Sequence, residues 1–146
     1  MISYQSENVT VPKFPRRAVG AWIRRVAAKY GKRVGDVAYI FCNDARILEV
    51  NRQYLQHDYY TDIITFDYTE ADTIGGDIFI SLDTVASNAV IFDKEVGDAQ
   101  TAFRQELMRV IIHGILHLCG IDDKGPGQRE VMERHENEAL ALYCLS

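Results

Sequence analysis

Residues 98–123 read DAQTAFRQELMRVIIHGILHLCGIDD and predict the helix around which the domain is organised. Asp98 can cap the start of this helix, and Gly120 can end it in the left-handed conformation that glycine tolerates. The apolar side chains recur at helical spacing on one face: Phe103, Leu107, Val110, Ile111, Gly114 and Leu118. A helix with so long an apolar face is expected to lie at the centre of the fold.

Shorter elements are expected on the two sides of this helix. The predicted strands cover residues 2–9, 37–42, 62–68 and 76–82, and the last two are expected to form a hairpin. The other predicted helices cover residues 14–30, 43–54, 83–92 and 127–143. The predicted fold class is therefore α+β, with a single small mixed β-sheet of about four strands packed with about five helices. One domain is expected to span residues 1–146.

The composition of the chain indicates its cellular location. The apolar stretches are shorter than the ~20 residues that a membrane span needs, and the first thirty residues lack the pattern of a signal peptide. Cys42, Cys119 and Cys144 are odd in number and widely spaced, so they do not suggest a disulfide framework. A cytoplasmic protein without a membrane partner is expected.

The charge is distributed unevenly along the chain. The net charge of -5 argues against a simple nucleic-acid-binding module. Residues 13–33 nevertheless contain eight basic residues and no Asp or Glu. Continued at helical spacing, Lys13 just before the predicted helix and Arg17 and Arg24 on it fall in one narrow stripe, which suits phosphate contacts on an RNA backbone. A solvated basic face explains the stripe equally well.

The central helix also carries a candidate metal site. His113 and His117 are four residues apart, so they point the same way about one turn apart. Gly120 lets the chain turn back, which can present Asp123 as a third ligand. Two imidazoles and one carboxylate leave a fourth position for water, which is the pattern of a catalytic zinc site. Asp122 is an alternative third ligand.

Two further residues could assist or join this site. Glu106 lies seven residues before His113, where it could hydrogen-bond a ligand imidazole or poise the metal-bound water. A solvated glutamate on a helix is the alternative. His135 on the last helix could approach the metal, although a partly exposed histidine among charged residues is the plainer interpretation.

The segment His113-Gly-Ile-Leu-His117-Leu-Cys-Gly120-Ile-Asp122-Asp123 resembles the signature of the YbeY family, the metal-dependent endoribonucleases that act as rRNA maturation factors in bacteria. Further matches are residues 51–54, Asp58, residues 61–66 and residues 76–81. The resemblance implies one zinc ion per chain at a three-ligand site and cleavage of single-stranded RNA during maturation of the 16S rRNA 3′ end. It also implies rRNA and the small ribosomal subunit or its proteins as partners.

The chain departs from the family pattern at two positions. Asp123 stands where the family usually has a third histidine, and Leu55 stands where many members have an arginine thought to serve catalysis. A carboxylate keeps the ligand count but adds negative charge, which should make bound water less acidic. Arg52 could supply the missing cation, although it also fits a surface helix position. The expected catalytic set is His113, His117, Arg52 and Glu106.

The resemblance to the YbeY family also implies that Thr61, Asp62 and Thr65 belong to a strand that forms the wall of the active cleft. Turn and strand-start chemistry explains the same polar residues, and for Thr65 it is the preferred interpretation.

Two other functions fit the sequence. A zinc peptidase or other metal hydrolase would share the spacing of the motif H-E-x-x-H, but Gly114 occupies the position of the catalytic glutamate. A ribosome-biogenesis binding protein with a structural metal would explain why Asp123 and Leu55 depart from the family pattern.

Overall fold

The computed structural model describes residues 1–55, 61–96 and 99–144. The strands are β1 (Ile2–Ser6), β2 (Arg33–Cys42), β3 (Ile63–Asp67) and β4 (Thr73–Ser81). The helices are α1 (Arg16–Lys29), α2 (Asp44–Val50), α3 (Leu82–Val96), α4 (Ala99–Leu118) and α5 (Gln128–Cys144), with one π-helical turn, η1 (Asn51–Leu55). The predicted α+β class is confirmed. Asp58 and the expected helix cap Asp98 lie outside the described residues.

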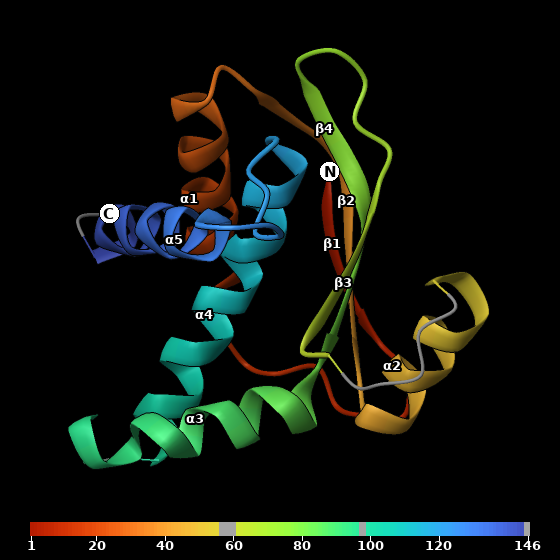
Figure 1. Ribbon diagram of the computed structural model, residues 1–146, viewed down its shortest axis with the longest axis vertical. Coiled ribbons are helices and arrows are strands. Elements are labelled where there is room, and N and C mark those ends of the chain that lie inside the picture. Colours follow the sequence, from red (N-terminus) through yellow and green to blue (C-terminus); the bar gives the residue numbers. More distant parts are fainter. Residues whose placement is uncertain (56–60, 97–98, 145–146) are drawn as a thin grey trace.

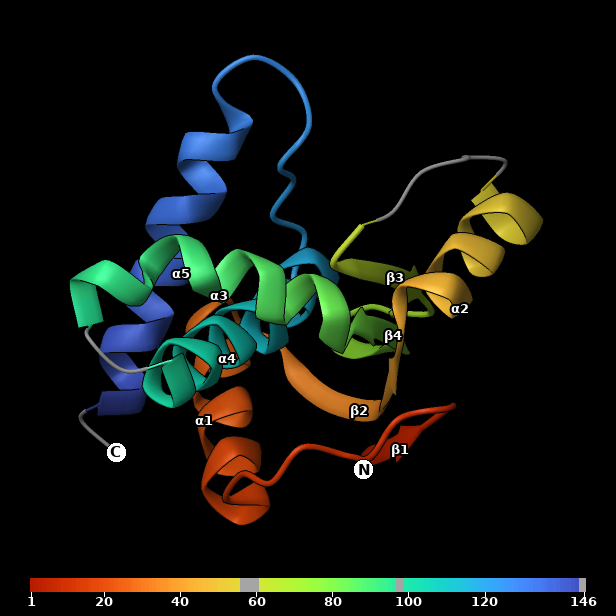
Figure 2. The same cartoon turned by 90° about the horizontal axis from the view of Figure 1, so that it is seen from below.

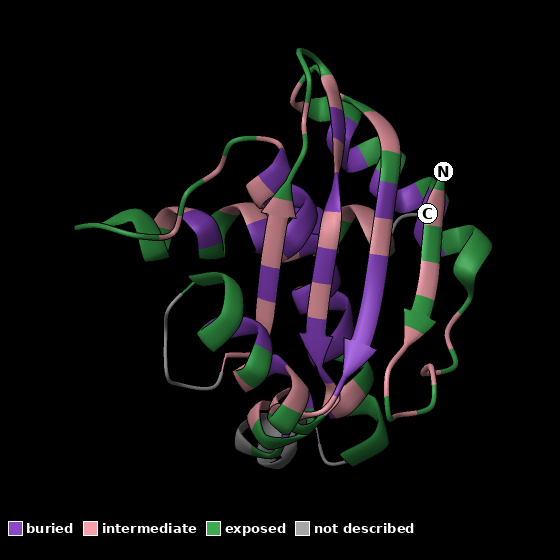
Figure 3. Cartoon of the chain, turned by 90° about the vertical axis from the view of Figure 1, so that its right-hand side faces the viewer, coloured by how far each residue is buried: buried purple, intermediate pink, exposed green. Residues whose placement is uncertain are grey.

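The four strands form one mixed sheet in the order β1-β2-β4-β3. β1, β2 and β4 run parallel, whereas β3 pairs antiparallel with β4 as the predicted hairpin. Figure 3 shows the sheet face on, with β1 and β3 as its two edges. β2 begins at Arg33, four residues before the predicted start at Val37, because Arg33 and Val34 pair with β4 before an irregularity in the register.

The main core lies between one face of the sheet and the helices α1 and α4, with α3 and α5 packed against α4 (Figures 1 and 2). Trp22 of α1, Tyr39 of β2, Ile78 of β4 and Ile111 of α4 are fully buried there. Burial of each such side chain stabilises the fold by about 1.5–3 kcal/mol. On part of the other face of the sheet, α2 packs over a smaller cluster that includes Cys42 and Ile64.

Gly114 sets how closely α4 approaches the sheet. A Cβ atom at this position would lie 2.9 Å from Ile78 Cδ1 and 3.2 Å from Ile63 Cδ1. Only a glycine lets the helix backbone pack this tightly on β3 and β4. The close packing brings the last turns of α4 beside β3, an edge strand of the sheet. Among the described residues, no helix is long and apolar enough to cross a membrane.

Candidate metal centre

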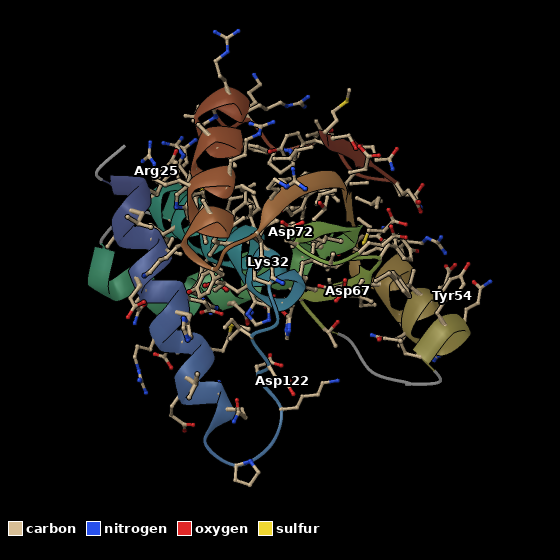
Figure 4. The ribbon with its side chains drawn as sticks, turned by 90° about the horizontal axis from the view of Figure 1, so that it is seen from above. Arg25, Lys32, Tyr54, Asp67, Asp72 and Asp122 are labelled. Carbon is tan, nitrogen blue, oxygen red and sulfur yellow. The ribbon has the colours of Figure 1, made fainter. Side chains whose placement is uncertain are left out.

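A cleft of about 650 Å³ lies along β3 and α4. The loop after α4, the first turn of α5, both ends of η1 and Asn88 of α3 complete its described lining. Thr61 and Asp62 line this cleft, as the resemblance implied, and so does Thr65, for which strand-start chemistry was the preferred interpretation. The Thr65 hydroxyl is buried without a hydrogen-bond partner among the described residues. Figure 4 shows Asp122 on the loop between α4 and α5 and Asp67 at the end of β3, and both residues line the cleft.

His113, His117 and Asp123 meet at this cleft. The Nε2 atom of His113 lies 3.4 Å from Asp123 Oδ2, and the Nε2 atom of His117 lies 3.5 Å from Asp123 Oδ1. The three ligand atoms all lie within 4.8 Å of one another. Ligand atoms about 2.1 Å from a tetrahedral zinc ion are about 3.4 Å apart. The residues therefore fit an ion of this size, with both imidazoles presenting Nε2.

The turn after α4 produces this geometry. Gly120 has a φ of +99°, a conformation that residues with a Cβ atom rarely adopt. The N–H of Ile121 donates to the carbonyl of Leu116, so the chain folds back over the helix end. The reversal carries Asp123 back to the two histidines, as the spacing predicted.

Each of the two histidines has a second partner that orients its ring. The Glu136 carboxylate accepts a hydrogen bond from His113 Nδ1 at 2.5 Å, and the backbone of Ile121 hydrogen-bonds the His117 side chain. A hydrogen bond at one ring nitrogen fixes the tautomer and leaves the other nitrogen for a metal ion. Burial, together with the charge of His113, lowers the pKa of His117 and favours the neutral imidazole that metals bind.

Glu136 belongs to a buried ionic network that includes Glu106. Arg109 donates to Glu136 Oε1 at 3.0 Å and forms two hydrogen bonds with the Glu106 carboxylate. Both carboxylates are only 3% exposed. Burial alone would raise the pKa of Glu136, but His113 and Arg109 outweigh it and hold that pKa below its ordinary value. Burial raises the pKa of Glu106, although Arg109 opposes the shift.

The structure contradicts two of the three sequence interpretations of Glu106. Glu106 is buried rather than solvated, and it bonds Arg109 rather than a ligand imidazole. The carboxylate that bonds the imidazole is Glu136, which the sequence did not single out. The spacing of Glu106 and Arg109 is a local signal for an ion pair on a helix, but the contact from α5 has no such signal.

The whole chain matches one protein family. The family model described as "Endoribonuclease YbeY" covers residues 1–143. The chain belongs to the YbeY family. Proteins named endoribonuclease YbeY from Phocaeicola vulgatus and Bacteroides thetaiotaomicron are 65% and 61% identical to it. The first alignment covers 99% of this chain and 100% of the relative, and the second covers 97% and 98%.

Solved structures with a similar fold include one from Thermotoga maritima. The solution structure of TM1509 from Thermotoga maritima matches with a TM-score of 0.58 and 25% sequence identity. The match covers 97% of this chain and 90% of that chain. The similarity therefore extends over nearly the whole fold rather than over α4 alone.

The two alternative ligands of this YbeY site have other partners. The Asp122 carboxylate accepts hydrogen bonds from the backbone N–H groups of Asp123 and Lys124, so it shapes the loop. His135 Nδ1 lies 2.6 Å from the Tyr30 hydroxyl and packs against that ring. The triad of metal-ligand atoms comprises neither residue.

The expected cation and the basic stripe lie away from the triad. Arg52 is an exposed residue of η1 and is not among the described residues that line the cleft, whereas Leu55 is. Arg17 and Arg24 line a separate groove of about 510 Å³ beside β1. Lys13 precedes α1 and is not part of that groove's described lining.

Proposed function

We propose that this YbeY chain is a metal-dependent endoribonuclease that cleaves single-stranded RNA. The observation that carries the proposal is the set of ligand atoms of His113, His117 and Asp123, spaced for one ion at an open cleft. We assign zinc, one per chain, because two imidazoles and one carboxylate form a common catalytic zinc site. The relatives named endoribonuclease support the same reaction.

The described residues have separate tasks in this reaction. His113, His117 and Asp123 would hold the ion at the edge of the cleft. A bound zinc ion supplies Lewis acidity, which polarises a phosphate oxygen or activates water. Glu136 keeps the ring of His113 in place, and Arg109 keeps the charge of Glu136 compensated. The cleft wall formed by β3 limits how an RNA strand can lie beside the ion.

Asp123 would reduce how strongly a bound metal ion polarises water. A carboxylate ligand neutralises part of the charge of the ion, so the ion polarises bound water less than it would with three histidines. We expect Asp123→His to bind metal and to shift the rising limb of the pH profile of cleavage to lower pH. Cleavage over a pH series, with metal content measured in parallel, checks this expectation.

Neither alternative function is favoured. A peptidase would need a glutamate at position 114. The Cβ atom of that glutamate would clash with Ile78 and Ile63, so α4 or the sheet would have to shift to admit it. A purely structural metal is also disfavoured, because the triad lies at a cleft. The side chains that pack α4 into the main core do not include the triad. The family membership supports the nuclease over both.

Membership of the family supports a proposal for the substrate and its setting. We propose that the chain acts in the cytoplasm on rRNA, at the 3′ end of 16S rRNA, during assembly of the small ribosomal subunit. Lys13, Arg17 and Arg24 are proposed to contact RNA phosphates or a ribosomal protein. Arg17 and Arg24 line a groove beside β1, and the metal cleft lies beside β3 at the opposite edge of the sheet. These contacts would therefore hold the ribosomal RNA away from the cleavage point.

A direct test compares cleavage of single-stranded and double-stranded RNA of the same sequence, with and without a chelator. We expect metal-dependent cleavage of the single strand only. His117→Ala should abolish it, and His135→Ala is the matched control because His135 bonds Tyr30 rather than joining the triad. Equal cleavage by the two variants would contradict the proposed site.

A further inference from the structure

The metal cleft needs positive charge of its own. Cleavage of a phosphodiester builds negative charge on the phosphate oxygens, and enzymes place cations against that charge. The described lining of the cleft also includes four carboxylates, those of Asp62, Asp67, Asp122 and Asp123, which repel a phosphate chain. Three basic residues line the cleft among the described residues: Arg109, Lys124 and Arg129.

Arg109 is already paired with two carboxylates. Its guanidinium binds Glu106 through Nε and Nη2 and Glu136 through Nη1. The two buried carboxylates more than balance its single positive charge. Arg109 therefore holds the support of His113 in place and has little charge left for a phosphate.

Lys124 and Arg129 are exposed and can bind a phosphate. Neither side chain is paired with a carboxylate in the part of the chain that the structure describes. Lys124 follows the ligand Asp123 directly, and Arg129 lies in the first turn of α5. Between them, Gly125 and Gly127 have φ values of +100° and +77°, so the chain turns sharply and returns Arg129 to the cleft.

We propose that Arg129 and Lys124 bind the phosphate that is cleaved and stabilise its developing charge. The proposal rests on the proposed function, because it assigns the substrate-binding groups of the same cleft. One segment thereby supplies both a metal ligand and the phosphate-binding cations. Arginine suits this task because its planar guanidinium can bind two phosphate oxygens at once.

The test compares Lys124→Gln/Arg129→Gln with the wild type and with Arg134→Gln. Arg134 is an exposed arginine on the same helix that is not part of the described cleft lining. Three quantities are measured for each zinc-loaded protein: bound metal, kcat and KM on single-stranded RNA, and affinity for phosphorothioate single-stranded RNA in the cold, where hydrolysis is slow. Arg129→Lys separates charge from bidentate geometry.

We expect the double variant to keep its metal and lose about a hundredfold in kcat/KM, which is the typical effect of removing a group that stabilises transition-state charge. Its affinity for the phosphorothioate strand should fall about tenfold or more, and Arg134→Gln should match the wild type. Arg129→Lys should retain more activity than Arg129→Gln.

A gain-of-charge variant provides a second readout. Leu55 lines the same cleft from η1 and is 40% exposed, so Leu55→Arg would place a new guanidinium at the cleft. We expect this change to restore part of the kcat/KM lost in Lys124→Gln/Arg129→Gln, which a merely structural role of the two residues would not allow.

Two results would overturn the proposal. One is a double variant that binds and cleaves RNA as well as Arg134→Gln does. The other is a double variant that loses its metal, since the two residues would then act on the metal site. Failure of the proposed function looks different: the wild type would not cleave RNA, yet the effect of the double variant on RNA affinity would still decide the role of the two cations.

Discussion

Replacing Glu136 by glutamine should weaken metal binding without removing any metal ligand. The carboxylate is 3% exposed, accepts a hydrogen bond from His113 Nδ1 at 2.5 Å and receives another from Arg109 at 3.0 Å. The glutamine side chain would keep the shape and one acceptor atom but lose the charge. Loss of such a carboxylate partner typically costs 10–100-fold in metal affinity. Because a hydrogen-bond acceptor remains, we expect a loss of about tenfold, or about 1.4 kcal/mol.

The assay is a competition for zinc between the protein and a chromophoric chelator at fixed pH. Glu133→Gln is the matched control, because Glu133 is an exposed glutamate on the same helix. Glu136→Ala removes the acceptor as well and should lose about a hundredfold. If Glu136→Gln binds zinc as tightly as Glu133→Gln, the carboxylate does not position His113 and the reasoning about the network is wrong.

Three further predictions test the fold around the site. Gly114→Ala gains about 1 kcal/mol of helix propensity, but its methyl group would lie 2.9 Å from Ile78 Cδ1. Overpacking costs about 1–3 kcal/mol, so urea unfolding should show a net loss of stability of up to about 2 kcal/mol, and a gain in stability would contradict the tight contact. Chelation of zinc should lower Tm by about 5–10 °C, while the far-ultraviolet circular dichroism spectrum stays that of the folded protein. Complete unfolding on chelation would indicate a structural metal. Burial raises the pKa of the Cys42 thiol from 9.0 to about 12, so thiol reagents should label Cys42 only on unfolding. Above pH 9 the unfolded thiol ionises while the folded one stays protonated, so this group should lower stability as pH rises from about 9 towards 12.

The central helix and the metal triad could be predicted because their signals are local. Apolar residues at helical spacing placed α4, and its observed bounds, Ala99–Leu118, agree with the predicted helix. The triad needed only the four-residue spacing of His113 and His117 and a glycine that reverses the chain before Asp123. Each of these depends on backbone geometry within one short segment, which the sequence specifies directly.

The support of the site could not be predicted, because it depends on how two helices cross. Glu136 is 23 residues from His113 and lies on a helix rich in charged residues. A glutamate in such a helix normally faces water, and no local pattern tells which face of α5 meets α4. The early start of β2 was missed for a related reason. Residues 33–36 do not form an apolar run, but Arg33 and Val34 still pair with β4.

The cations of the cleft illustrate the same limit. The sequence indicated that position 55 lacks an arginine and suggested Arg52 nearby in the chain, whereas the fold brings Lys124 and Arg129 to the cleft from beyond the triad. Residues that are close in space but distant in sequence can be identified only from the tertiary structure.

The most direct test of the metal centre is elemental analysis of the purified protein beside His113→Ala and Asp123→Ala, with each preparation assayed on single-stranded RNA. We expect about one zinc ion per chain in the wild type. Both variants should lose the metal and the cleavage together. An Asp123→Ala variant that keeps its metal and still cleaves RNA would contradict the site described above.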